Sequence, residues 1–416
     1  MSSSLFKSFW MGGFECSTHR RNDGKRLDVI AATKHDRFFR EDYLRLKKAG
    51  LETMRDGLRW HLIEKRPYVY DWSQVVPMLK AVEQLDIEVV WDLCHYGWPD
   101  DLDIFSSQFP LRFAEFARAF AKLHAEIVST PPRLTLINEI SFFSWVAGEA
   151  GIFFPYAQGR AAEIKRQLVS AEILATAFVR DIAPHTRFIH TDPMIHVVAD
   201  SSDEEQIAQA AVQNEAQFEA LDMLIGRKFP ELGGQRDFLD ILGVNYYIHN
   251  QWVHPGGHGS MIESDDPRFR PIWQLLEDTY KRYSCPIFIA ETGIEDEARP
   301  QWLKFISNEV RLALKAGVPV EGICLYPIVN HPGWDNDRHC HNGLWDYTDE
   351  EGKRPIYVPL SQELERQQRI SSLPHGAEFI QPLTPFEELK IHESAHTIEG
   401  ATEVFRAVVD ENGNLN

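Results

Sequence analysis

Two glutamates at the ends of apolar segments are the residues of this chain most able to do chemistry as a pair. Glu291 directly follows the apolar residues 286–290, and Glu139 follows residues 134–137 with Asn138 between them. In retaining glycoside hydrolysis, one carboxylic acid protonates the leaving oxygen and one carboxylate attacks the anomeric carbon, with the two carboxyl groups roughly 5–5.5 Å apart. We therefore predict that Glu139 is the acid/base and Glu291 the nucleophile, if the fold brings them together.

Eight strand-like apolar segments alternate with eight amphipathic segments, and this order predicts the fold. The expected strands are residues 9–16, 53–60, 88–94, 134–137, 187–191, 239–244, 286–290 and 322–327. The expected helices are residues 36–49, 74–84, 110–128, 161–182, 204–226, 271–283, 300–315 and 360–370. Strand-then-helix repeated eight times is typical of an α/β fold of the (β/α)8 (TIM) barrel type. We expect one catalytic barrel over residues 1–370. A tail over residues 371–416, with short helices at 385–389 and 401–409, either packs on the barrel or is partly mobile.

Functional side chains of such a barrel collect at the C-terminal ends of its strands. Strands four and seven face each other across the barrel mouth, so Glu139 and Glu291 are expected to meet there. Arg55, on the second predicted strand, is expected to keep Glu291 ionised, because a nearby cation lowers the pKa of a carboxyl group. Tyr247, after the sixth strand, is expected to donate a hydrogen bond to the same carboxylate.

Charge and targeting patterns narrow the class of protein. The 416 residues carry a formal net charge of −19, which disfavours nucleic acid or an anionic membrane as partner and favours a small-molecule or oligosaccharide substrate. The first residues do not resemble a signal peptide, and no run of about 18 apolar residues occurs. Five widely spaced cysteines give no disulfide framework, so we expect a cytoplasmic protein.

No nucleotide-binding or phosphate-binding motif occurs, and we expect no cofactor. The oligomeric state is left open.

Six short motifs occur in an order that resembles a known family. They are Arg55 with Trp60, His95-Tyr96-Gly97-Trp98-Pro99, Asn138-Glu139, Gly243-Val244-Asn245-Tyr246-Tyr247, Glu291-Thr292-Gly293 and Gly343-Leu344-Trp345-Asp346-Tyr347. Together they resemble clan A of the glycoside hydrolases, and most closely family 1, the β-glucosidase-type family. The resemblance runs from residue 9 to about residue 348. It implies sugar-binding roles for His19, Arg55, His95, Asn138, Asn245, Tyr247, Tyr326 and Trp334, beside the catalytic Glu139 and Glu291.

The departures from the family pattern fall on its sugar-reading positions. His19 stands where the family has a glutamine, and the region of Gly333 lacks the family's glutamate, for which Asp335 or Asp337 is a candidate substitute. Ile140 replaces the proline that follows the acid/base. The catalytic half of the pattern is kept and the specificity half is altered, so the resemblance leaves the glycone open.

Other patterns have competing interpretations. His331, His339, Cys340 and His341 cluster in one loop, but their spacing fits no standard zinc pattern, and we predict loop or substrate hydrogen bonding without a metal. The aromatic residues after the acid/base form either an aglycone platform or a plain hydrophobic patch; they are Phe142, Phe143, Trp145, Phe153 and Phe154. Transglycosylation or endo-β-glycanase action on the same barrel remains an alternative to simple hydrolysis, and a non-catalytic carbohydrate-binding barrel is a further one.

Overall fold

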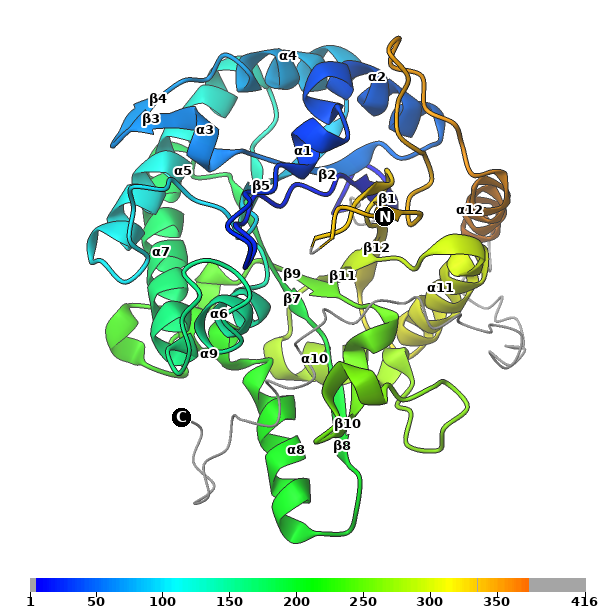
Figure 1. The fold of residues 1–416 in the computed structure, drawn as a ribbon. Coiled ribbons are helices and arrows are strands. Elements are labelled where there is room, and N and C mark those ends of the chain that lie inside the picture. Colours follow the sequence, from blue (N-terminus) through cyan, green and yellow to red (C-terminus); the bar gives the residue numbers. More distant parts are fainter. Residues whose placement is uncertain (1–4, 335, 374–416) are drawn as a thin grey trace.

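Eight parallel strands close into a barrel in the computed structural model, which describes residues 5–334 and 336–373. The strands are β1 (Trp10–Gly13), β2 (Thr53–Gly57), β5 (Glu88–Cys94), β6 (Arg133–Ile137), β7 (Arg187–Pro193), β9 (Ile241–Asn245), β11 (Ile287–Thr292) and β12 (Val320–Leu325). Their order around the barrel follows the sequence, and β12 pairs with β1 to close it. The predicted (β/α)8 barrel is therefore confirmed (Figure 1).

Helices follow the strands and form the outer layer of the barrel (Figure 1). They are α2 (His35–Lys48), α4 (Val75–Leu85), α5 (Gln108–Ile127), α7 (Ala161–Ile182), α8 (Glu204–Ala216), α9 (Glu219–Leu224), α10 (Ile272–Tyr283), α11 (Arg299–Lys315) and α12 (Val358–Ser371). Shorter elements decorate the two rims and the loops. They are α1 (Val29–Ala32), α3 (Trp60–Ile63), β3 (Glu64–Arg66), β4 (Val69–Tyr70), α6 (Ile140–Gly148), β8 (His196–Ala199), β10 (Gln251–His254), β13 (His331–Pro332) and β14 (His339–Cys340).

Three predicted elements were wrong in their bounds. The first strand, expected over residues 9–16, ends at Gly13. The helix expected over residues 204–226 is two helices, because α8 leaves the barrel to cover the ribbon of β8 and β10, whereas α9 returns Leu221 and Leu224 to the core. The second strand ends at Gly57 rather than residue 60. Trp60 instead begins α3, where its ring stacks on Phe116 of α5.

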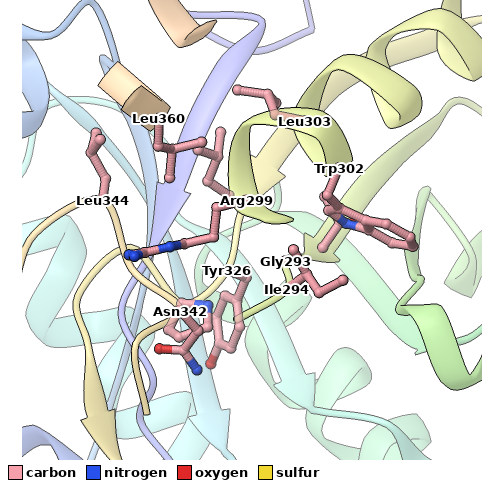
Figure 2. A pocket seen from close by; sticks show the side chains of 12 residues that line it. Gly293, Ile294, Arg299, Trp302, Leu303, Tyr326, Asn342, Leu344 and Leu360 are labelled. Carbon is pink, nitrogen blue, oxygen red and sulfur yellow. The ribbon is translucent and has the colours of Figure 1, made fainter. Parts of the chain in front are cut away.

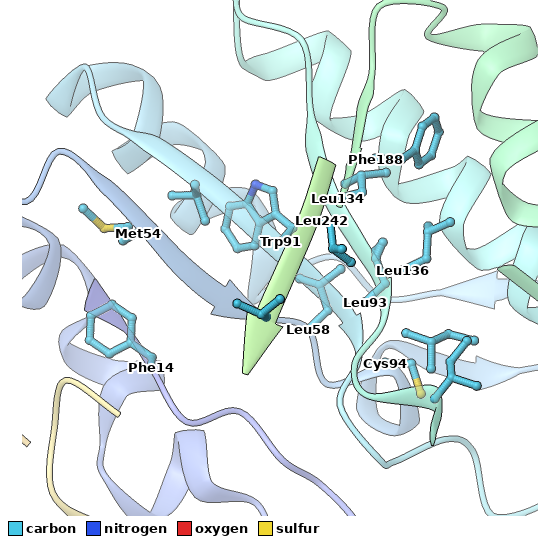
Figure 3. Close-up of a cluster of buried hydrophobic side chains, with 14 of the residues drawn as sticks. Phe14, Met54, Leu58, Trp91, Leu93, Cys94, Leu134, Leu136, Phe188 and Leu242 are labelled. Carbon is cyan, nitrogen blue, oxygen red and sulfur yellow. The ribbon is translucent and has the colours of Figure 1, made fainter. Parts of the chain in front are cut away.

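The strands bury a different apolar set on each of their two faces. The interior set includes Met11, Val90, Ile189, Ile241 and Phe288, which come from five different strands. The outer set packs between strands and helices, and Figure 3 shows part of it, including Trp91, Leu93, Leu134, Leu136 and Leu242. Successive residues of one strand, such as Val90 and Trp91, thus face opposite sides, as the period of two in a strand requires. This alternation fixes which side chains can reach the barrel mouth.

No helix in the described part of the chain is both long and apolar enough to cross a membrane. The helix predicted over residues 360–370 is confirmed as α12. The helices predicted over residues 385–389 and 401–409 lie outside the described residues.

Candidate active site

Glu291 reaches the barrel mouth because β11 is irregular just before it. Ile287 and Ile289 lie in the outer core, whereas Phe288 and Ala290 lie in the interior core. Strict alternation would therefore turn Glu291 outward. The register of β11 with β9 shifts between Ile289 and Glu291, and such bulges re-aim a side chain beside a functional site. Glu291 consequently joins the interior polar residues and is 4% exposed.

A cation and a phenol hold the two oxygens of Glu291. Arg55 Nη1 donates to Glu291 Oε1 at 3.0 Å, and Tyr247 Oη donates to Oε2 at 3.0 Å. Burial raises the pKa of Glu291, and the adjacent Arg55 guanidinium opposes that rise. The structure thus places both residues at the carboxylate where the sequence predicts them, in an arrangement that favours the ionised form.

Arg55 is fully buried and connects Glu291 to the neighbouring strands. Its Nη2 donates to Asp92 at 2.8 and 3.0 Å and to Asn138 Oδ1 at 3.2 Å, and its guanidinium lies 5.2 Å from the centre of the Tyr326 ring. Asp92 neutralises a cation that burial would otherwise penalise heavily. One guanidinium therefore fixes the relative positions of groups from β2, β5, β6 and β11.

Glu139 sits at the start of α6 in a strained backbone conformation. Its φ of 48° and ψ of 61° are left-handed, a region that non-glycine residues rarely adopt. Although Glu139 occupies the N-cap position of α6, its side chain makes no capping hydrogen bond. Instead Asn245 Nδ2 donates to its Oε1 at 2.8 Å, and the Tyr96 hydroxyl makes a short hydrogen bond to its Oε2. The carboxyl group therefore points into the barrel mouth.

No cation contacts Glu139 in the described part of the chain, so no contacting positive charge lowers its pKa. Burial and the charge of Glu291 raise the pKa of Glu139 to about 8. The hydrogen bonds from Tyr96 and Asn245 act in the opposite direction but do not cancel the rise. At neutral pH Glu139 is therefore largely protonated, whereas Glu291 beside Arg55 is the better candidate for the ionised partner.

Asn138 contacts His95 and Tyr96. Arg55 and Thr191 both donate to Asn138 Oδ1, at 3.2 and 2.7 Å, which turns the amide nitrogen toward His95. Asn138 Nδ2 then lies 3.1 Å from His95 Nε2 and donates to the Tyr96 hydroxyl oxygen at 3.1 Å. Burial lowers the pKa of His95, but the neighbouring Cys16, Asp92 and Glu15 raise it well above its ordinary value.

Two further side chains surround His95 Nδ1. Cys16 Sγ and Asp92 Oδ2 lie 3.2 and 3.5 Å from His95 Nδ1, so three atoms of ligand type come together in the barrel. We read this cluster as a hydrogen-bonded network that orients His95.

The loop after β12 also brings atoms of ligand type together, because those of His339, His341 and Asp346 lie within 4.8 Å of one another. The rings of His339 and His341 stack with centroids 4.3 Å apart and planes 23° apart, and such nearly parallel rings do not direct two lone pairs at one ion. His339 Nε2 lies 2.8 Å from Asp346 Oδ1. His331 accepts a hydrogen bond from Asn342 at 3.0 Å, which fits the predicted loop hydrogen bonding.

Aromatic side chains pack around His19. His19 stacks on Phe153 with ring centres 3.6 Å apart and meets the edges of Tyr96 and Trp334. Burial lowers the pKa of His19 well below its ordinary value, so the ring is neutral. Neither ring nitrogen of His19 has a hydrogen-bond partner among the described residues, although the side chain is 1% exposed.

The aromatic residues that follow Glu139 differ in their burial. Phe143 and Phe153 are buried, whereas Phe142, Trp145 and Phe154 are partly buried. Phe142 lies 6.2 Å from Trp334 and 6.0 Å from Trp145 between ring centres. The partly buried residues can therefore extend the aromatic wall outward from the site.

One network of contacts links all ten residues singled out from the sequence. They are His19, Arg55, His95, Asn138, Glu139, Asn245, Tyr247, Glu291, Tyr326 and Trp334. Asp337, considered as a substitute for a sugar-reading glutamate, instead lies 3.0 Å from Arg21 and 2.6 Å from Lys25 at the rim. Asp335 lies outside the described residues.

Three residues of the site were not selected from the sequence. Asp92 could have been found as a carboxylate inside an otherwise apolar strand, and Tyr96 lies within a motif but has no motif role. Glu15 is a third buried glutamate at the mouth: its Oε1 accepts from the Ser17 backbone at 2.9 Å and lies 3.8 Å from His95 Nε2. No described residue donates to its other oxygen.

A separate pocket lies behind the wall that carries Glu291. Its lining includes Thr292, Gly293, Arg299, Trp302, Tyr326 and Asn342 (Figure 2). A Cβ at Gly293 would lie 2.5 Å from the Tyr326 carbonyl oxygen, so the residue two places after Glu291 must be glycine for β11 and the β12 loop to approach. The pocket borders Tyr326 but includes neither glutamate.

Comparison with known proteins agrees with this architecture. No family model matches the chain. Over 181 residues it is 25% identical to a β-galactosidase of Sulfolobus acidocaldarius, and this match covers 37% of the chain and about a third of that relative's length (36%). A family 1 β-glucosidase from Thermotoga maritima superposes with a TM-score of 0.71 at 16% identity, covering 86% of this chain and 97% of the other. The complex of a β-glucosidase from Thermotoga maritima with glucoimidazole superposes with a TM-score of 0.70 at 17% identity. This match covers 84% of this chain and 90% of the other. The chain has the fold of the family 1 β-glucosidases.

Proposed function

We propose that the protein is a retaining β-glycosidase that hydrolyses small β-glycosides with Glu291 as nucleophile and Glu139 as acid/base. The observation that carries this proposal is the difference between the two carboxyl environments. Glu291 contacts the Arg55 cation, whereas Glu139 contacts neutral donors only. Burial raises the pKa of both groups, but only Glu291 has the Arg55 cation to oppose that rise, which fits the roles of ionised nucleophile and protonated acid. The fold shared with β-glucosidases supports the same reading.

In the first step Glu291 attacks the anomeric carbon as the glycosidic bond breaks. One Glu291 oxygen forms a bond to the anomeric carbon, and the electron pair of the breaking bond goes to the leaving oxygen. Glu139 supplies the proton that this oxygen takes up, so the aglycone leaves as a neutral alcohol or phenol. Arg55 and Tyr247 keep the attacking carboxylate ionised and oriented until the bond forms.

In the second step water replaces the enzyme at the anomeric carbon. Glu139, now a carboxylate, takes a proton from water while the water oxygen attacks and the bond to Glu291 breaks. Esterification removes the charge of Glu291, one of the causes that raise the pKa of Glu139, so the carboxylate form is favoured when a base is needed. Two inversions at the same carbon give overall retention.

The charge of the site favours neutral glycones. Besides Glu139, which is largely protonated, the buried carboxyl groups of Glu15, Asp92 and Glu291 lie together, facing Arg55 and His95. A glycone with its own carboxylate or phosphate would meet repulsion that little solvent screens. We therefore propose uncharged β-glycosides as substrates, and a reaction that needs no cofactor.

Transfer to a sugar acceptor is the second candidate reaction. Water and a second sugar compete for the same glycosyl-enzyme, and Phe142, Trp145 and Trp334 are aromatic surfaces on which an acceptor ring could stack. Product analysis with added acceptor separates the two: transfer products that exceed hydrolysis products would favour the transglycosidase.

A panel of chromogenic glycosides tests the proposal. The panel holds the β-glucoside, β-galactoside, β-mannoside, β-fucoside and β-xyloside with their α-anomers, each offered to the wild type and to Glu291→Ala. We expect turnover of at least one β-glycoside and loss of that turnover in the variant. A protein that binds these glycosides without turning any over would instead be a carbohydrate-binding barrel.

A further inference from the structure

The end of β7 holds the segment that carries Glu139 through four hydrogen bonds. Glu139 N donates to the Thr191 carbonyl at 3.0 Å, and Thr191 Oγ1 donates to Asn138 Oδ1 at 2.7 Å. Ser141 then donates twice to Asp192, from its backbone N–H to Oδ1 at 3.0 Å and from its hydroxyl to Oδ2 at 2.8 Å. The segment is therefore fixed on both sides of the glutamate.

The contact with Asp192 replaces a helix cap that Glu139 does not provide. The residue at the N-cap position normally accepts a hydrogen bond from the second or third backbone N–H of the helix. Glu139 occupies that position in α6, and Ser141 is the second helical residue, yet the Glu139 side chain makes no such bond. Asp192, from a different strand, accepts it instead. The Glu139 carboxyl group is thereby left free to face Asn245 and Tyr96.

Two buried charged residues, His190 and Glu172, hold Asp192 in place. His190, two residues earlier on β7, lies 3.5 Å from Asp192 Oδ2 through Nε2 and 3.2 Å from both oxygens of Glu172 through Nδ1. All three side chains are buried. Burial alone would lower the pKa of His190, but Glu172 and Asp192 raise it to about 10, so the ring is a cation between two carboxylates at neutral pH.

We propose that Asp192 is a positioning residue for Glu139: it caps α6 in place of that glutamate and so holds it in the left-handed conformation that aims its carboxyl group at the substrate. His190 and Glu172 keep Asp192 in the capping orientation from the side of α7. A left-handed non-glycine residue persists only where its surroundings over-determine it, and the contacts on β7 meet that requirement. This inference rests on the proposed function of Glu139.

The dependence on leaving group separates positioning from mere support of the fold. An aryl glycoside with a poor leaving group, such as phenol, needs the proton from Glu139, whereas one with 2,4-dinitrophenol does not. For Asp192→Ala we expect kcat/KM on the phenyl glycoside to fall roughly 10²-fold, the lower end of what general acid catalysis supplies. On the dinitrophenyl glycoside we expect a fall of less than about 3-fold, because the nucleophile is untouched.

Asp203→Ala is the matched control. Asp203 caps α8 by accepting from Glu205 N at 3.1 Å, so its loss removes the same kind of contact away from the site. Because Asp203 is exposed whereas Asp192 is buried, we expect the control to lose less Tm than Asp192→Ala and to keep both rates. Asp192→Asn, which retains an acceptor for the Ser141 N–H, should recover much of the rate on the phenyl glycoside.

Two outcomes would overturn the inference. Equal losses on both glycosides in Asp192→Ala would mean a general structural role, and no loss on either would mean that α6 holds Glu139 without this cap. If Asp192→Ala does not fold, Ser141→Ala, which removes the hydroxyl that donates to Asp192, carries the same comparison of leaving groups. A wild type that turns over neither glycoside would refute the proposed function itself, which distinguishes that failure from failure of the positioning role.

Discussion

Glu291 and Glu139 are both buried at the barrel mouth, but a cation holds one and only neutral donors hold the other. Glu291 lies within a strand and shares Arg55 with Asp92. Glu139 lies just beyond a strand, at a helix start, and receives hydrogen bonds from Tyr96 and Asn245. The same side chain is thus prepared for two protonation states by its neighbours.

The difference also extends to how each backbone is held. A β-bulge turns Glu291 inward within the sheet, whereas Glu139 depends on a left-handed backbone held from β7. The position of Glu291 inside the sheet suits an attack that requires one geometry. The position of Glu139 at a helix start, held from β7, suits a group that first donates a proton and then accepts one. The predictions below test this contrast from the largest expected effect to the smallest.

Loss of the nucleophile should have the largest effect. In Glu291→Ala we expect kcat to fall roughly 10⁴- to 10⁶-fold on every substrate, because no covalent intermediate can form. Steady-state kinetics with both good and poor leaving groups measures this loss. Glu295→Ala, which removes a rim glutamate paired with Arg338 at 2.5 Å, is the control and should retain activity. Activity of Glu291→Ala within about 10-fold of the wild type would remove the basis of the account.

Loss of the acid/base should be large only where a proton is needed. In Glu139→Ala we expect a fall of roughly 10²- to 10⁴-fold in kcat/KM for glycosides with poor leaving groups and a small change for dinitrophenyl glycosides. Added azide, which needs no general base to attack, should speed breakdown of the intermediate and yield the β-glycosyl azide. Equal losses for all leaving groups would contradict the role assigned to Glu139.

Arg55→Lys tests the cation that contacts Glu291 but not Glu139. Lysine keeps a charge but cannot donate to Glu291, Asp92 and Asn138 together, so we expect misalignment and about a 10²-fold fall in kcat/KM. Arg55 lowers the pKa of Glu291, so weakening this contact should move the acidic limb of the pH profile to higher pH. Arg187→Lys, at a partly exposed pair with Asp240, should leave the profile unchanged.

The basic limb of the pH profile should report Glu139. We expect kcat/KM of the wild type to decline as pH rises through about 8, because Glu139 loses the proton that it must donate. The Tyr96 hydrogen bond lowers this pKa, so Tyr96→Phe should move the basic limb to higher pH with only a modest change in rate. A shift to lower pH, or a basic limb that stays in place in Glu139→Ala, would refute the assignment.

The strands and most helices could be predicted from the sequence because their signals are local. Apolar runs such as residues 286–290, followed by amphipathic segments, identify each unit without knowledge of the rest of the chain. The break between α8 and α9 could not be predicted this way. It depends on the ribbon of β8 and β10, which pairs segments more than 50 residues apart.

The residues at the site could be predicted better than their orientation. Glu139 and Glu291 stand at strand ends in the sequence, but the bulge that turns Glu291 inward arises from register with both neighbouring strands. Asp92 was missed because its role depends on Arg55, which only the folded barrel brings close. Glu15 is expected at the rim from its place after the first strand, but its approach to His95 also needs the fold. Asp192 follows the fifth strand in the sequence, but its contact with Ser141 exists only in the folded barrel.

Trapping of the intermediate tests the central claim most directly. A 2-deoxy-2-fluoro glycoside with a dinitrophenyl leaving group slows both steps but keeps formation of the intermediate faster than its hydrolysis, so the glycosyl-enzyme accumulates. With the glycone that the panel identifies, mass spectrometry of the intact protein should show one added 2-fluoroglycosyl group, and peptide mapping should place it on Glu291. A label on Glu139 or on another residue, or turnover of the ordinary glycoside with inversion and no label, would contradict the account.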